Sequence, residues 1–65
     1  MVPEIGHVAG AVWRHLKENG DTSVPKLVKE LNENDFVVYA ALGWLAREDK
    51  VDVFVKGRTK MAKLK

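Results

Sequence analysis

The sequence predicts a single α+β domain that is mainly helical, with three helices followed by a C-terminal β-hairpin. Three observations lead to this expectation. Apolar residues recur every three or four positions as far as about residue 48, which is helical spacing. A short polar turn interrupts that pattern before the third helical segment. After Lys50 the period changes to two, with valine at every second position from Val51 to Val55, which is the spacing of a strand.

The length of the chain sets a limit on its stability. Its 65 residues fit one domain, residues 1–65. A domain this small buries only about 60% of its unfolded surface, so its stability is marginal. Small proteins often add disulfides, a metal or a partner subunit. The sequence has no cysteine, and its two histidines cannot form a metal site alone. Good packing or oligomerisation is therefore the expected source of stability.

The first helix is predicted from Glu4 to about Asn19. Pro3 is expected to precede it, and Gly20 is expected to end it, because glycine readily adopts the left-handed conformation of a C-cap. The apolar stripe of this helix is Ile5, Val8, Ala9, Val12, Trp13 and Leu16.

A short extended piece is expected at residues 22–24, because Pro25 disfavours helical conformation in the residue before it. Pro25 itself suits the first turn of a second helix, which would have Ser23 or Val24 at its cap. This helix is about two turns long. Its apolar face is Leu27, Val28 and Leu31.

The third helix is predicted from Phe36 to about Glu48, after a polar break at residues 32–35. Asp35 is the expected N-cap, since Asp and Asn accept hydrogen bonds from the free backbone N–H groups of a first turn. Two helices joined by a short polar turn, the second one longer, are typical of a helix-turn-helix. The inward stripe of the third helix is Val38, Ala41, Leu42 and Leu45.

The C-terminal hairpin is predicted with its register. Gly57-Arg58 fits a two-residue type II′ loop. A slip by one residue would reverse both faces of the hairpin, so the register is well specified. The expected pairs are Lys56 with Thr59, Phe54 with Met61, Asp52 with Lys63, Val53 with Ala62, and Val51 with Leu64. The order of helix, short strand, helix, turn, helix and hairpin is that of a winged helix-turn-helix, in which the hairpin is the wing.

One run of residues resembles a known family. The run Ala41-Leu42-Gly43-Trp44-Leu45-Ala46-Arg47-Glu48-Asp49-Lys50, with Glu4-Ile5-Gly6 and Ala9-Gly10-Ala11-Val12-Trp13, is similar to small prokaryotic stand-alone winged helix-turn-helix proteins of unknown function. The resemblance covers nearly the whole chain. It implies the fold and a nucleic-acid connection but no reaction. The fold serves DNA binding and protein–protein contact alike, so the residues must decide between them.

The outer face of the third helix is apolar where a DNA reader would be polar. Base edges are read by Arg, Lys, Asn, Gln, Ser and Thr, usually from the N-terminal part of this helix. Here only Arg47 is of that kind, and it lies at the C-terminal end. The residues are therefore predicted to form a protein interface, made of Phe36, Val37, Ala40, Gly43, Trp44 and Arg47. The alternative for Trp44 and Val37 is that they cover the first helix or the hairpin as part of the core.

Nucleic-acid contact would rest on basic residues outside the third helix. The net charge of +2 permits such contact without requiring it. Contacts from the second helix and the wing would give affinity without sequence information. The alternative is an ordinary solvated surface, because lysine is mostly exposed in all proteins. The candidate residues are Lys26, Lys29, Lys56, Arg58 and Lys60.

Several classes of function are not expected. The sequence has no nucleophile–base pair, phosphate loop or metal-ligand spacing, so we expect no enzyme, cofactor, metal or small-molecule ligand. No stretch approaches 18 apolar residues, and the N-terminus lacks the features of a signal peptide. No membrane contact and a cytoplasmic location are therefore expected.

Two hypotheses remain. In the first, the protein is a binding module that forms a homodimer, or docks on another protein, through its third helix, and the wing and second helix make any nucleic-acid contact. In the second, it is a DNA-binding transcriptional regulator with the third helix in the major groove. The outer face from Phe36 to Trp44 is the feature that separates them.

Overall fold

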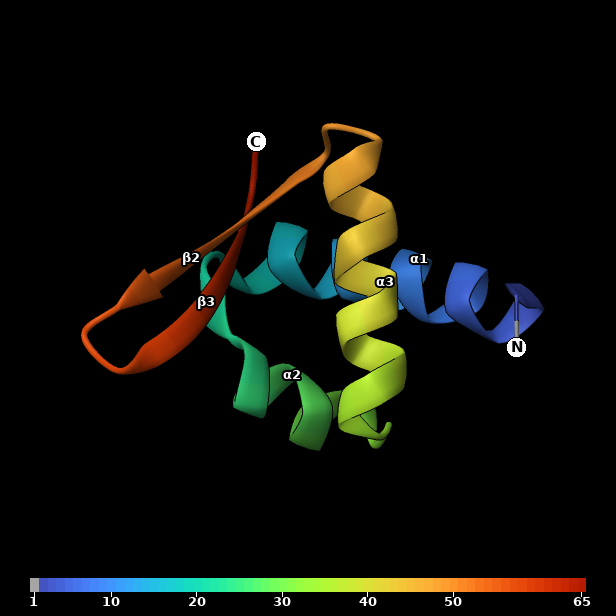
Figure 1. Ribbon diagram of the computed structural model, residues 1–65, viewed down its shortest axis with the longest axis horizontal. Coiled ribbons are helices and arrows are strands. Elements are labelled where there is room, and N and C mark those ends of the chain that lie inside the picture. Colours follow the sequence, from blue (N-terminus) through green and yellow to red (C-terminus); the bar gives the residue numbers. More distant parts are fainter. Residues whose placement is uncertain (1) are drawn as a thin grey trace.

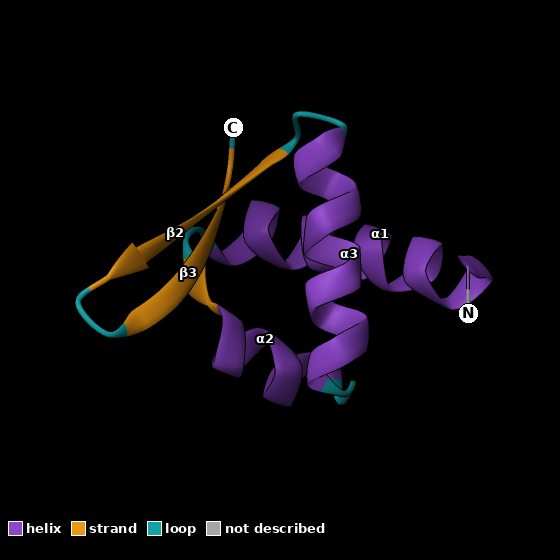
Figure 2. Ribbon diagram, in the orientation of Figure 1, coloured by secondary structure: helices purple, strands orange, loops and turns teal. Residues whose placement is uncertain are grey.

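The computed structural model describes residues 2–65, and side chains from residue 5 onward. Its three helices and three strands form the expected winged helix-turn-helix (Figure 2). The elements in order are α1 (Val2–Asn19), β1 (Thr22–Ser23), α2 (Val24–Leu31), α3 (Asp35–Arg47), β2 (Val51–Lys56) and β3 (Thr59–Leu64).

The third helix, α3, contacts both other helices and the hairpin strand β2. Figure 1 shows α3 lying across α1, with α2 beside the start of α3. The hairpin of β2 and β3 extends away from the helices, on the opposite side from the N-terminus. The wing and the N-terminal half of α1 are therefore at opposite ends of the molecule.

The ends of α1 and α2 follow from local chemistry. The first helix begins at Val2, earlier than predicted, so Pro3 lies in its first turn rather than before it. Proline is tolerated there because the N–H that it lacks would have had no helical partner. Gly20 has φ 79° and ends the helix as expected. Ser23 caps α2 and accepts a hydrogen bond from the Lys26 backbone N–H at 3.2 Å.

The start of α3 differs from the prediction by one residue. Asn34, not Asp35, is the N-cap, and its Oδ1 accepts a hydrogen bond from the Val37 backbone N–H at 2.9 Å. Asp35 is the first helical residue, where its negative charge suits the positive end of the helix dipole. Asn and Asp cap helices about equally well, so residue type alone does not decide between Asn34 and Asp35.

The sheet confirms the predicted hairpin register. Every predicted pair occurs, from Val51 with Leu64 to Lys56 with Thr59. Gly57 has φ 64°, whereas Arg58 has no positive φ, and this combination fits the type II′ loop. The short strand β1 also pairs with β3, so the strand order is β1-β3-β2 and β2 lies at an edge.

The core corrects one predicted interface residue. Val37 is only 5% exposed and packs with the inward stripe of α3, so the prediction that it belongs to an exposed interface is wrong. Helix α3 has apolar residues on most of its circumference. The side of α3 that the other elements bury is therefore wider than the predicted inward stripe. The core residues are Val8, Ala9, Val12, Leu16, Val24, Leu27, Val37, Val38, Ala41, Leu42, Leu45, Val51 and Ala62.

Candidate functional site

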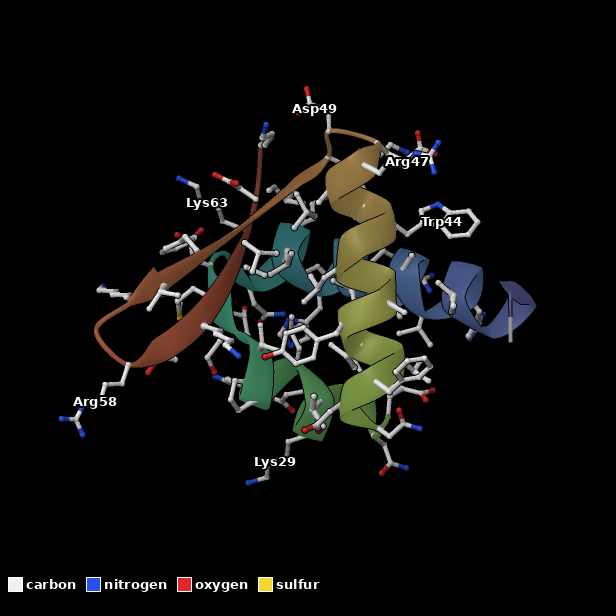
Figure 3. All side chains as sticks on the ribbon, viewed as in Figure 1. Lys29, Trp44, Arg47, Asp49, Arg58 and Lys63 are labelled. Atoms are coloured by element: carbon white, nitrogen blue, oxygen red, sulfur yellow. The ribbon has the colours of Figure 1, made fainter. Side chains whose placement is uncertain are left out.

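The exposed surface of the protein divides into two sides. Trp44 and Arg47 project from α3 on the side of the N-terminal half of α1 (Figure 3). Lys29 on α2 and Arg58 at the tip of the wing project on the other side, toward solvent. The predicted protein interface and the predicted nucleic-acid contacts are therefore separate surfaces.

We call the first surface the Trp44 face. It consists of Ile5, Gly6 and Gly10 of α1 with Phe36, Ala40, Gly43, Trp44 and Arg47 of α3. The α3 members recur at steps of three and four, which places them along one side of the helix. Phe36 is 66% exposed and Trp44 is 45% exposed. The structure thus leaves both aromatic side chains accessible, and Trp44 is not a core residue.

Trp44 stands between two shallow grooves. The first has a volume of about 560 Å³ and is lined by Ile5, Ala40, Gly43, Trp44, Arg47 and Glu48. The second has a volume of about 370 Å³, and half of its lining residues belong to α1, among them Gly6, Gly10 and Trp13. Trp44 lines this groove as well. Sequence reasoning did not assign the α1 residues to the site, because it treated each helix separately.

The three helical glycines of this face do not serve internal packing. A Cβ added at Gly6, Gly10 or Gly43 would meet nothing within 4 Å. Glycine inside a helix costs about 1 kcal/mol relative to alanine. These glycines therefore leave space at the surface, in the walls of the two grooves, rather than relieving a clash inside the protein.

The basic side is more dispersed. All five predicted residues are exposed: Lys26, Lys29, Lys56, Arg58 and Lys60. The wing also contacts α3, because the Lys60 Nζ lies 5.5 Å from the centroid of the Tyr39 ring. This contact was not predicted from the sequence. Tyr39 is 41% exposed. The sequence signal that could have placed Tyr39 at this surface is its position on the flank of α3 that faces away from Trp44. This side could contact a nucleic-acid backbone, but it offers few groups for reading bases.

One ion pair lies apart from both surfaces. The Lys65 Nζ is 2.6 Å from the Asp49 Oδ1, and this pair connects the C-terminal residue to the turn after α3. The hydrogen bond and the negative charge of Asp49 raise the pKa of Lys65 above its ordinary value. Asp49 has φ 62°, a left-handed conformation that Asp tolerates better than most residues.

Two kinds of feature are absent from the described part of the chain. Between residues 5 and 65, no group of three or more His, Cys, Asp or Glu side chains is placed to hold a metal ion. None of the helices from Val2 onward is both long and apolar enough to cross a bilayer.

Comparison with known proteins identifies the family. A family model described as a winged helix-turn-helix domain (DUF2582) matches residues 2–64. The chain belongs to this family. This chain is similar to the uncharacterized protein MJ1608 of Methanocaldococcus jannaschii. The two are 40% identical over 68 residues, which cover 100% of this chain and 96% of that protein. A small winged-helix family of unknown function is what the sequence resemblance predicted.

Solved structures share the fold of this DUF2582 protein. Protein BT2368 from Bacteroides thetaiotaomicron is 34% identical with a TM-score of 0.84, over 95% of this chain and 76% of that one. The Zα domain of Carassius auratus PKZ, solved in complex with Z-DNA, is 18% identical with a TM-score of 0.82, over 94% and 97%. A HOP2 structure, described in terms of DNA recognition and protein interaction domains, is 28% identical with a TM-score of 0.71, over 89% and 98%. Winged-helix domains of this class often bind DNA.

Proposed function

We propose that this DUF2582 protein is a non-enzymatic binding module that docks on protein through its Trp44 face, either by self-association or on another chain. The observation that supports this most is the exposure of Phe36 and Trp44 together on one side of α3. Large aromatic side chains are enriched at the centres of protein interfaces. In a DNA reader the same side of the helix would enter the major groove and present polar groups to base edges.

The charges of α3 also favour protein over base reading. The N-terminal part of the helix, which usually reads bases, carries Asp35 and Phe36 and no basic side chain. A carboxylate in that position would approach the phosphates and be repelled. Arg47 is in the last turn, beyond the usual reading positions. The outer side of α3 therefore suits an apolar partner better than a nucleic acid.

A second copy of the chain is one partner that fits this surface. Phe36, Ala40, Gly43 and Arg47 follow steps of four, three and four, the seam spacing of packed helices. In an antiparallel pair with its two-fold axis between Ala40 and Gly43, the small residues face each other and allow close approach. Phe36 of each copy then lies opposite Arg47 of the other, and a guanidinium over an aromatic ring is a favourable pair.

Sedimentation equilibrium tests self-association directly. We expect the parent protein to associate at high micromolar concentration, and Phe36→Arg to weaken the association by about tenfold or more, since an interface aromatic is worth at least about 1.4 kcal/mol. Tyr39→Arg is the matched control, because Tyr39 lies on the other flank of α3 and should leave association unchanged. A parent that stays monomeric at these concentrations rules out self-association and leaves only docking on a different protein.

Contact with a nucleic-acid backbone is the second candidate function. The observation that favours it is the basic wing, where Lys56 and Arg58 are exposed and Lys60 lies over Tyr39 of α3. Such binding would weaken steeply with salt and show little sequence preference. Replacing Lys56, Arg58 and Lys60 together by Ala should then weaken duplex DNA binding. Unchanged binding in this triple variant would remove the wing from the proposal.

The same Phe36→Arg change separates these functions from a transcriptional regulator that inserts α3 into the major groove. In that regulator an added Arg at the start of α3 would be tolerated by DNA binding or would strengthen it. In the protein-docking function it breaks the interface and has no role in DNA contact. Measuring association and DNA binding on the same variant therefore distinguishes the two hypotheses.

A further inference from the structure

The outer edge of the sheet is a second surface, independent of the Trp44 face. The strand order β1-β3-β2 gives β2 a strand neighbour on one side only. Asp52, Val53, Val55 and Lys56 are all exposed, and Val55 is 66% exposed. Exposed apolar residues on a free edge strand favour pairing with another strand, and natural proteins usually block such edges with charge or proline.

The hydrogen-bonding groups of β2 can be assigned from the register. In a hairpin closed by a two-residue loop, the residues that flank the loop form a hydrogen-bonded pair, here Lys56 and Thr59. Such pairs alternate along an antiparallel ladder. Asp52 and Phe54 therefore also direct their backbone groups toward β3. The N–H and C=O groups of Val53 and Val55 point to the free edge.

The strand is complementary to itself when two copies run antiparallel. With Phe54 opposite Phe54 of a second copy, Asp52 lies opposite Lys56 and Val53 lies opposite Val55. Opposite charges, aromatic pairs and β-branched pairs are the cross-strand combinations that stabilise sheets. The charged and aromatic pairs lie on one face and the valines on the other, because residues alternate along a strand.

Other registers lose this match. Residues that are directly opposite must both offer edge-facing groups or both lack them, so the pairing can shift only by two residues at a time. A shift in one direction places Asp52 opposite Phe54 and Lys50 opposite Lys56, which repel each other. A shift in the other direction leaves only residues 54–56 of each strand paired.

We propose that two copies of this chain join through β2, antiparallel about a two-fold axis at Phe54, so that their two three-stranded sheets become one continuous sheet. The charges continue the pattern across the joined strands. Asp52 lies between Lys63 of its own β3 and Lys56 of the second copy. The Lys63 Nζ is also 5.4 Å from the centroid of the Phe54 ring, so each aromatic of the central pair carries a cation.

This interface is small, and its expected strength follows from its size. One strand pair is at the low end of interface sizes, where associations are weak and transient. The wing tip at Arg58 projects away from Trp44 (Figure 3), so pairing through β2 does not cover the Trp44 face. The pairing and the proposed docking function therefore succeed or fail separately.

Charge exchange gives the sharpest test. Lys56→Asp places carboxylates opposite Asp52 in both symmetric positions, and Asp52→Lys does the same with ammonium groups. The comparison uses a parent that carries Phe36→Arg, so that association through the Trp44 face does not contribute. We expect each charge variant alone to associate about tenfold more weakly than this parent, which corresponds to like charges in two cross-strand pairs. An equal mixture of the two variants should recover association, because each strand then meets its complement. Lys29→Asp, the same charge change on α2, is the matched control and should behave as the parent.

Sedimentation of the mixture and amide exchange by NMR provide two readouts. Exchange at the Val53 and Val55 amides should slow as protein concentration rises, whereas the Phe54 amide should be protected at all concentrations. Asp52→Lys also loses its partner Lys63 within the hairpin, so circular dichroism must first show that it is folded. Val55→Pro removes an edge-facing N–H without changing charge or the β2–β3 ladder, and it should abolish pairing.

Each outcome decides the proposal. It is overturned if Val53 and Val55 exchange at a rate independent of concentration, or if the mixed charge variants associate no better than each alone. Phe36→Arg should leave pairing through β2 intact, and Lys56→Asp should leave docking through the Trp44 face intact. Association that is abolished in Phe36→Arg but insensitive to the charge variants would assign it to α3 and overturn the β2 pairing.

Discussion

Gly43 lies in the middle of α3, where a glycine weakens the helix and nothing inside the protein requires it. Gly43→Ala should therefore raise the free energy of unfolding by about 1 kcal/mol, measured by urea denaturation. If the space at Gly43 admits a second helix, the same change should weaken association through the Trp44 face.

The opposite response is expected at Gly20, whose φ of 79° disfavours any residue with a Cβ. Gly20→Ala should lower stability by roughly 1 kcal/mol.

The pair of Lys65 and Asp49 contributes to the free energy of unfolding, and this contribution depends on pH with a sign that follows from the pKa of Lys65. Asp49 raises the pKa of Lys65 in the folded protein. A raised lysine pKa contributes stability that is fully present below the unfolded pKa and is lost as the pH rises through the folded value. Asp49→Asn retains the left-handed turn and removes the charge. We expect parent and variant to differ in urea midpoint at neutral pH and to converge at strongly alkaline pH. A difference that grows with pH would contradict this assignment.

At the scale of elements, the start of α3 offers a direct comparison between two residues. Asn34 accepts the capping hydrogen bond, whereas Asp35 acts only through its charge. Asn34→Ala should lower the free energy of unfolding by about 1 kcal/mol. Asp35→Ala should cost less, roughly 0.3–1 kcal/mol at low salt, and this smaller effect should vanish at high salt. Equal, salt-independent losses in the two variants would mean that Asp35 shares the capping role.

The sequence was most informative where a pattern was long enough to specify one arrangement. The hairpin register follows from alternation on both faces of two strands together with a loop that contains glycine, and every predicted pair occurs. The pairing of Thr22 with Ala62 could not be predicted, because the two residues of β1 are too few to show a period. Boundaries shifted where neighbouring residues had equal chemistry, as at Asn34 and Asp35.

The candidate site was predictable only in part for a related reason. Periodicity separates the inside of a helix from the outside when one side is polar, but α3 has apolar residues almost all round. Val37 and Trp44 lie close together on the helical projection, yet only Val37 is buried. The contribution of Gly6 and Gly10 to the groove beside Trp44 depends on how α1 crosses α3. That crossing is a tertiary feature, which no single-helix pattern contains.

At the scale of the whole molecule, the distribution of charge separates the functions. The charged groups at the Trp44 face lie at its C-terminal end, where Arg47 belongs to the face and Glu48 lines both adjoining grooves. Lys29 on α2 and Arg58 at the tip of the wing project away from Trp44 (Figure 3). A partner held on the Trp44 face would therefore leave the basic side free, so protein docking and backbone contact with a nucleic acid are compatible in one complex.

The salt dependence of DNA binding tests that compatibility on the intact protein. Removing one side chain that neutralises a phosphate should reduce the slope of log K against log salt by about 0.9. Replacing both Lys56 and Arg58 by Ala should therefore lower the slope by about 1.8 and weaken binding equally for all sequences. The matched control replaces Arg14 and Lys17, two exposed basic residues of α1, and removes the same total charge. If both double variants show the same reduction in slope, binding reflects net charge alone. If neither shows any reduction, the wing does not bind the nucleic-acid backbone, and the proposal of backbone contact is overturned.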